Sequence, residues 1–145
     1  MKHKPIDKHP LSLVFEHLDK DTVLIEKLAE IRKDNSYDFN MLFTFEIGEE
    51  YRKSELSPFL RFVPISMVEG GYSDDYESQF FEFYFSLEIF TEMISEGYSI
   101  AQYIVDKYKN DLNCICYAQD LQFDETHKLY NTFLRFKIIV EKGEF

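Results

Sequence analysis

The chain has 145 residues, a formal net charge of −11 and hydrophobic residues at 45% of its positions. This length suits one folded domain, which we place at residues 1–145 with loose tails at 1–9 and 141–145. The acidity repels nucleic acid and anionic lipid, so neither is expected as a direct partner. No run approaches the roughly 20 apolar residues of a membrane span, and no signal segment is visible, so we expect a protein made in the cytoplasm.

Two helical segments are predicted near the start of the chain. The first begins at Pro10, a residue that suits the first turn of a helix, and ends at the break formed by residues 19–21. Asp21 or Thr22 can cap the second segment, which we expect to end at residues 32–33. The apolar residues of both segments recur at helical spacing: Leu11, Val14, Phe15, Leu18, Leu24, Leu28 and Ile31.

The apolar period then changes from about 3.6 to about 2 residues, which predicts strands. We expect the first two strands at residues 41–47 and 59–65. Pro64 should lie at a strand end or on a sheet edge, because proline lacks an N–H. Residues 66–78 are predicted to form a loop, since Gly70 and Gly71 favour turns. One face of the first strand would hold Phe43, Phe45 and Ile47.

Residues 80–90 give the strongest strand pattern in the chain, with two unlike faces. The face expected in the core holds Phe81, Phe83, Phe85, Leu87 and Ile89. The opposite face is half aromatic and half polar, and holds Phe80, Glu82, Tyr84, Ser86, Glu88 and Phe90. Such a mixed face indicates either contact with another subunit or pairing across strands.

A helix and two strands complete the predicted fold. Ser99 with Gln102 forms a capping box, and Tyr98 with Tyr103 a hydrophobic staple, so we expect a helix from about residue 99 to 108. Strands near 114–123 and 129–140 should be joined by a hairpin loop at 124–128. The expected class is α+β: a mainly antiparallel sheet of four to five strands, with an N-terminal helical region and one later helix packed on it.

The residue types of catalytic and metal sites are present, but not at the spacings that such sites need. The histidines show no helix-spaced metal pair, and the acids near Asp74 lack the calcium pattern of an EF-hand. Cys114 and Cys116 lie in an apolar strand, where we expect reduced and buried thiols. No nucleophile or phosphate-binding motif is found. We therefore expect no enzyme activity, no cofactor and no metal.

Two stretches resemble a known family. The sequences MLFTFEIGEEYRK at 41–53 and FLRFVPI at 59–65 resemble the early strands of tail terminator and tail-to-head joining proteins of long-tailed bacteriophages. The helical region before them and the later helix and hairpin fit the same order of elements. The resemblance implies a ring, typically of six subunits, at the head-proximal end of the tail tube, where it stops tube growth and provides the joint to the head.

The same resemblance implies the partners and the location. They are further copies of this chain, the tail tube protein and the head completion or connector protein, all in a virion assembled in the bacterial cytoplasm. DNA passes through such a ring, and an acidic lining would keep DNA from adhering to it. The candidate residues of a lumen or interface loop are Glu69, Asp74, Asp75 and Glu77.

A ring needs a head-to-tail interface, in which two different patches of one subunit pair. We expect one patch at Tyr84 and Phe90, and the opposing patch at Arg135 and Lys137 of the last strand. The alternative is a small acidic protein-interaction or inhibitor module of the cytosol that binds a basic partner. Stoichiometry separates these hypotheses, since an inhibitor would be a monomer or dimer.

Overall fold

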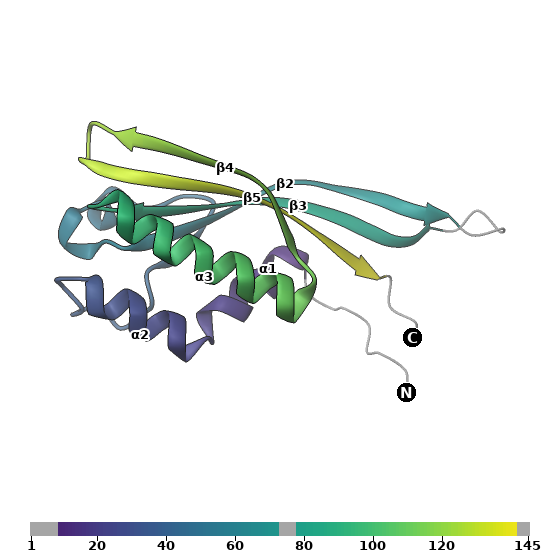
Figure 1. Ribbon diagram of the computed structural model, residues 1–145, viewed down its shortest axis with the longest axis horizontal. Coiled ribbons are helices and arrows are strands. Elements are labelled where there is room, and N and C mark those ends of the chain that lie inside the picture. Colours follow the sequence, from purple (N-terminus) through teal and green to yellow (C-terminus); the bar gives the residue numbers. More distant parts are fainter. Residues whose placement is uncertain (1–8, 73–77, 142–145) are drawn as a thin grey trace.

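Three helices cover one face of a five-stranded sheet in the computed structural model, which describes residues 9–72 and 78–141 (Figure 1). The elements in chain order are α1 (Pro10–Asp19), α2 (Thr22–Ile31), β1 (Leu42–Thr44), the short 3-10 helices η1 (Glu49–Tyr51) and η2 (Ser54–Leu56), β2 (Phe59–Tyr72), β3 (Ser78–Thr91), α3 (Ile94–Leu112), β4 (Ile115–Asp124) and β5 (Leu129–Glu141). The strand order is β1-β2-β3-β5-β4, with β1 parallel to β2 and the other neighbours antiparallel. The predicted α+β class is confirmed.

The N-terminal helices begin where the sequence predicts. Pro10 is the first residue of α1, and Asp21 caps α2 by accepting hydrogen bonds from the backbone N–H groups of Val23 and Leu24 at 3.1 and 3.3 Å. Asp21 also accepts a bond from the hydroxyl of Tyr103 at 2.7 Å, which ties the helix junction to α3. The cap thus serves both the local helix and its packing.

The start of α3 differs from the prediction. The helix begins at Ile94, five residues before Ser99, because the side chain of Glu96 accepts a hydrogen bond from the backbone N–H of Met93 at 3.2 Å. The predicted capping box at Ser99 is therefore wrong. Tyr98 lies on the exposed side of the helix and cannot act as a staple. The buried face of the helix includes Ile100, Ile104 and Tyr108.

The main core is an aromatic stack between the sheet and the helices. Phe85 stacks on Phe83 and on Phe136, with ring centroids 5.6 and 5.2 Å apart. Tyr108 meets Phe136 edge-on at 5.2 Å, and its hydroxyl donates a 2.6 Å hydrogen bond to the carbonyl of Val14. Each such buried side chain contributes about 1.5–3 kcal/mol. This packing confirms the core face predicted for residues 80–90.

A second, smaller core lies on the opposite face of the sheet, at one end. It consists of Met41, Ile47, Leu56, Phe59, Phe90 and Leu129, with Phe43 and Tyr51 packed against it. The segment between β1 and β2 folds over this end of the sheet and covers these residues. Phe90 is 4% exposed and stacks on Phe59 at 5.0 Å.

The strand predicted at residues 41–47 is only three residues long. Met41 and Phe45 have positive φ values of 60° and 66°, and these left-handed residues end the alternation on both sides of β1. As a result Phe45 is exposed, whereas Phe43 and Ile47 pack on the second core. The prediction that these three residues share a face is wrong for Phe45.

The loop predicted at residues 66–78 is mostly strand. β2 continues to Tyr72 and β3 begins at Ser78, so the two form a long hairpin that extends beyond the helices (Figure 1). The register shifts between Pro64 and Ser66, and this bulge lets the strand continue past the proline. β1 pairs with β2 only at residues 60–62, so Pro64 lies on a free edge, as predicted.

Candidate assembly surface

The face of the sheet that carries no helix has a paired set of polar residues at its centre. Arg61 forms an ion pair with Glu88, whose side chain is 5% exposed. Asn131 donates a 2.8 Å hydrogen bond to the other oxygen of that carboxylate. The three residues lie on β2, β3 and β5, so this network joins the three central strands. Because the buried charge is paired and hydrogen-bonded, it has a structural role.

Beside this network lies a group that the sequence singles out. Tyr84 of β3 is directly opposite Lys137 of β5, and Lys137 Nζ lies 3.6 Å from the carboxylate of Glu82. The ring of Tyr84 meets that of Tyr117 edge-on at 5.9 Å. Arg135 lies over the ring of Phe133, with 5.3 Å from its guanidinium carbon to the ring centroid. These side chains form one mixed aromatic and charged surface.

The predicted interface residues do not form the two separate patches that a head-to-tail contact needs. Tyr84, Arg135 and Lys137 belong to the same surface, so they cannot supply its two opposing patches. Phe90 is covered by its own chain in the second core. Whether the surface around Tyr84 touches a neighbour stays a prediction.

The candidate lumen loop is shorter than expected. Glu69 lies in β2, opposite Phe81, and is exposed at the far part of the hairpin rather than in a loop. Asp74, Asp75 and Glu77 lie outside the described residues. Of the four residues the structure describes Glu69 alone, on a strand, and the acidic lining stays a prediction.

Two uncovered sheet edges are a feature that the sequence reading missed. Among the residues that the structure describes, none pairs with the outer side of β4, and none pairs with β2 on its outer side beyond the three residues opposite β1. Large apolar side chains are exposed along both edges: Ile115, Tyr117, Leu121 and Phe123 on β4, and Ile65, Met67 and Val68 on β2. The interrupted alternation of residues 115–123 is the signal that could have revealed the first of them. Long apolar edges are sites for strand pairing with another chain.

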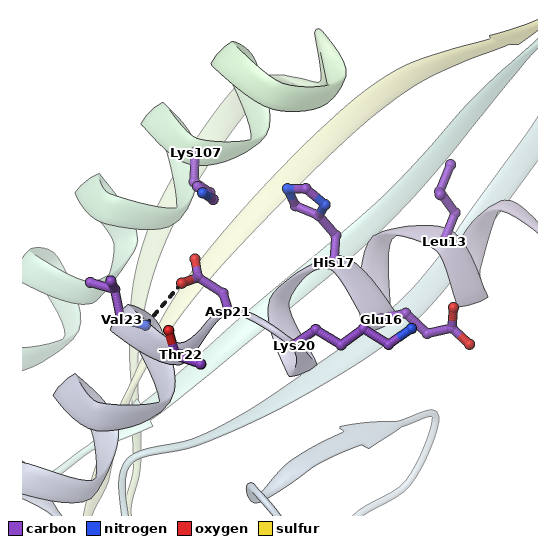
Figure 2. Close-up of a pocket in the computed structure, with 8 residues that line it drawn as sticks. All are labelled: Leu13, Glu16, His17, Lys20, Asp21, Thr22, Val23 and Lys107. Atoms are coloured by element: carbon purple, nitrogen blue, oxygen red, sulfur yellow. Dashed lines mark hydrogen bonds between the residues drawn. The ribbon is translucent and has the colours of Figure 1, made fainter.

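A polar groove of about 560 Å³ lies between the junction of α1 with α2 and helix α3 (Figure 2). Two of its charged groups, His17 and Lys107, bind one carboxylate beside it. Asp111, beside the groove, accepts from His17 at 2.8 Å and from Lys107 at 3.1 Å, and these two bonds lower the pKa of its carboxyl. Figure 2 shows Asp21 turned to the backbone of α2 as its cap. His17, Lys107 and Asp21 of the groove are thus already bound to other groups of the chain.

The three described histidines, His9, His17 and His127, each hydrogen-bond to another group of the chain. His127 lies between Glu49 and Asp124, with each carboxylate on a different ring nitrogen, at 3.0 and 2.7 Å. Hydrogen bonds to Glu49 and then to Asp124 raise the pKa of His127. Cys114 and Cys116 are free thiols; Cys114 is buried as predicted, whereas Cys116 is only half-buried, and burial raises the pKa of both. Across residues 9–72 and 78–141, no set of three ligating side chains is arranged for a metal.

The described helices lack the combination of length and apolar character that a membrane crossing requires.

No protein-family model matches the chain, and neither does any curated protein. Among solved structures, the chain is similar to one in the virion of a native gene transfer agent (GTA) particle, with a TM-score of 0.60 and 12% identity. The match covers 90% of this chain and 93% of that chain, so the likeness extends over the whole α+β fold.

Proposed function

We propose that the protein is a structural component of a phage-like virion, and that its copies join head to tail into a ring at the head-proximal end of a tail tube. The observation that carries the proposal is the pair of uncovered edges on opposite sides of one sheet, β4 on one side and residues 65–72 of β2 on the other. The fold likeness to a chain of the gene transfer agent virion supports the virion location.

The strand directions allow the sheet to continue from one copy into the next. β2, β3, β5 and β4 alternate in direction, so β4 runs opposite to β2. β4 of one copy can therefore pair antiparallel with the free edge of β2 in its neighbour. This contact is heterologous, because it uses two different surfaces, and it can repeat until a ring closes.

The position of each free edge along the sheet also fits a ring. β4 lies level with residues 59–66 of β2, as the pairing through β5 and β3 shows, whereas the free edge of β2 continues further along the hairpin. A neighbour must then shift along the strand direction to pair. A sheet that closes on itself requires a stagger of this kind. All copies would keep their helices on the same side of the ring wall.

Lysine at the edge of β4 tests the proposal. Leu121→Lys places a charge beside the strand that the neighbour would bring, whereas the matched control Val23→Lys changes an exposed apolar side chain on α2. Light scattering over a range of concentrations, with and without purified tail tube, should show ring-sized particles for the wild type and the control and only monomers for Leu121→Lys. Circular dichroism checks that both variants fold.

The outcomes separate two errors. A wild-type chain that stays monomeric even with tail tube refutes the ring and favours the acidic interaction module. A Leu121→Lys variant that still forms rings refutes the role of the β4 edge but leaves the ring itself standing. The partners that we propose in the particle are the tail tube protein on one side of the ring and the head completion or connector protein on the other.

A further inference from the structure

Four aromatic rings gather at the surface beside the second core. Tyr37, Phe39, Phe43 and Tyr51 contact one another, with centroid distances from 5.3 to 6.3 Å. Phe43 and Tyr51 form an inner layer that seals the second core, while Tyr37 and Phe39 rest on them and are 41% and 39% exposed. Tyr37 and Phe39 therefore present aromatic surface to the solvent.

The same segment is strongly acidic. Residues 34–51 contain five acids and no Lys, Arg or His: Asp34, Asp38, Glu46, Glu49 and Glu50. Arg32 precedes them, but its guanidinium points inward and donates to the carbonyls of Leu56 and Pro58, so it does not offer its charge at this surface. Glu49 is already paired with His127 at 3.0 Å, and the charge of Lys53 acts on Asp34, so the negative charge open to a partner comes mainly from Asp38, Glu46 and Glu50. We call the four rings together with these five acids the aromatic–acidic surface.

A small pocket opens next to the outer rings. It has a volume of about 110 Å³ and is lined by Ile25, Ala29, Arg32, Asp34, Asn35, Tyr37, Phe39, Asn40 and Met41. With about 30 Å³ for one water, the pocket has room for one aliphatic side chain or a proline ring. Its carboxylate stays charged, because hydrogen bonds from Ser36 lower the pKa of Asp34. The surface thus combines a small pocket of mixed polar and apolar lining with negative charge around it.

The chain itself contains a segment of complementary chemistry. Residues 2–8 read KHKPIDK, with three lysines, one acid, a proline and an isoleucine. Lysine ammonium groups bind acids and the faces of aromatic rings, and proline docks well between aromatic side chains. We propose that the aromatic–acidic surface binds residues 2–8 of a second copy of this chain. This contact does not depend on the pairing of sheet edges.

The fold favours a second copy over the same chain. His9 is fixed where the segment leaves the domain: its ring packs edge-on against Phe83 at 5.3 Å and its Nδ1 caps α1 at 3.0 Å. From there α1 and then α2 lead away along the helical layer, and the aromatic–acidic surface follows the end of α2 (Figure 1). Seven extended residues reach at most about 24 Å, which suits a neighbouring copy placed beside α1.

A labelled peptide of residues 1–9, added to the full-length protein, tests the contact by fluorescence anisotropy. The assay uses the Leu121→Lys background, so that sheet-edge assembly does not interfere. We expect binding that weakens with salt, and a loss of at least about tenfold in affinity for Tyr37→Ala with Phe39→Ala, which removes two ring contacts. Tyr98→Ala, at another exposed tyrosine, should bind as the parent does. A peptide with its lysines replaced by glutamate should not bind.

Zero-length carbodiimide crosslinking of a mixture of 15N-labelled and unlabelled full-length chains identifies the copy that donates the segment. Mixed-isotope crosslinks between Lys2, Lys4 or Lys8 and the acids at 34–50 are expected. Crosslinks found only within one chain overturn the second-copy assignment. Equal peptide affinity for the Tyr37→Ala, Phe39→Ala variant and its parent, or no binding at all, overturns the surface itself, whatever the result for rings.

Discussion

Gly97 sets the distance between α3 and the sheet, and a double-mutant cycle can measure this role. A Cβ atom at Gly97 would lie 2.4 Å from Thr132 Oγ1 and 3.1 Å from Thr91 Oγ1. Neither hydroxyl can easily move away, because both threonines are buried. The Thr91 hydroxyl also donates a 2.7 Å hydrogen bond to the carbonyl of Met93. Gly97→Ala must therefore push the helix away from the sheet or strain Thr132.

The magnitude follows from two opposing effects. Overpacking of a tight contact costs about 3 kcal/mol, while replacing glycine by alanine inside a helix stabilises by about 1 kcal/mol. Gly97→Ala should therefore lower the free energy of unfolding by about 2 kcal/mol. Thr132→Ala removes the nearest atom and leaves Thr132 Cβ at an ordinary 3.5 Å. In that background Gly97→Ala should be neutral or slightly stabilising, so the coupling is about 2–3 kcal/mol.

Urea unfolding followed by circular dichroism measures the four free energies, at a concentration where the chain is monomeric. Gly48→Ala is the matched control, because its Cβ meets only the end of the flexible Glu50 side chain, at 2.6 Å, which can swing away. The control should cost under about 0.5 kcal/mol. Additivity of Gly97→Ala and Thr132→Ala within about 0.5 kcal/mol would refute the account of this contact.

Three further changes probe other parts of the fold. Arg32→Met leaves the carbonyls of Leu56 and Pro58 without their donor, so it should lower the free energy of unfolding, measured in urea, by about 3 kcal/mol. The control Lys33→Met, at an exposed residue, should change this free energy little. Burial lowers the pKa of Arg32 only to about 10, so Arg32 is charged at neutral pH. Tyr108→Phe removes the bond to the buried Val14 carbonyl and should cost about 1–2 kcal/mol by the same assay; an unchanged unfolding midpoint would contradict the bond. His127 has a raised pKa in the fold, so its ion pairs stabilise the fold fully below the unfolded pKa near 6.5 and are lost as pH rises through the folded pKa. The difference in unfolding free energy between wild type and His127→Gln should therefore vanish at high pH. A difference that does not change with pH would count against these ion pairs.

The helices and the long strands could be predicted because one local signal determined each. Pro10 and Asp21 fix the helix starts through backbone chemistry that involves only their neighbours. The alternation of Phe83, Phe85 and Leu87 matches a strand buried on one face. These elements needed no knowledge of what packs against them.

The errors come from backbone geometry and from tertiary contacts. The left-handed φ of Phe45 breaks a strand whose residue pattern remains regular. Phe90 continues the alternation of the outer face, but the segment before β2 folds over it, which no periodicity reveals. Gly70 and Gly71 suggested a turn, although the partner strand keeps them in a ladder. The free edges are a property of the whole strand order and could not be predicted from any single segment.

The bulges of the two edge strands determine which part of β4 can pair. The register shift in β2 follows Pro64, and the register shift in β4 follows Cys116. These two residues lie in one row across the sheet, because Pro64 is opposite Phe85, Phe85 is opposite Phe136, and Phe136 is opposite Cys116. Both edges therefore bulge at the same level of the sheet. Bulges increase the local twist and interrupt the regular spacing of outward N–H and C=O groups. An incoming strand can pair on either side of this line, but not across it.

The longer side of β4 runs from residue 118 to 124 and includes Leu121, whereas only Ile115 and Cys116 precede the shift. Strand pairing between copies should use the longer side, because it offers more backbone groups in register. Leu121→Lys should then abolish ring-sized particles in light scattering, while Ile115→Lys, at a similarly exposed apolar residue of the same strand, leaves them intact. Equal loss in both variants would mean that the contact depends on general apolar character rather than on a strand paired beyond the bulge.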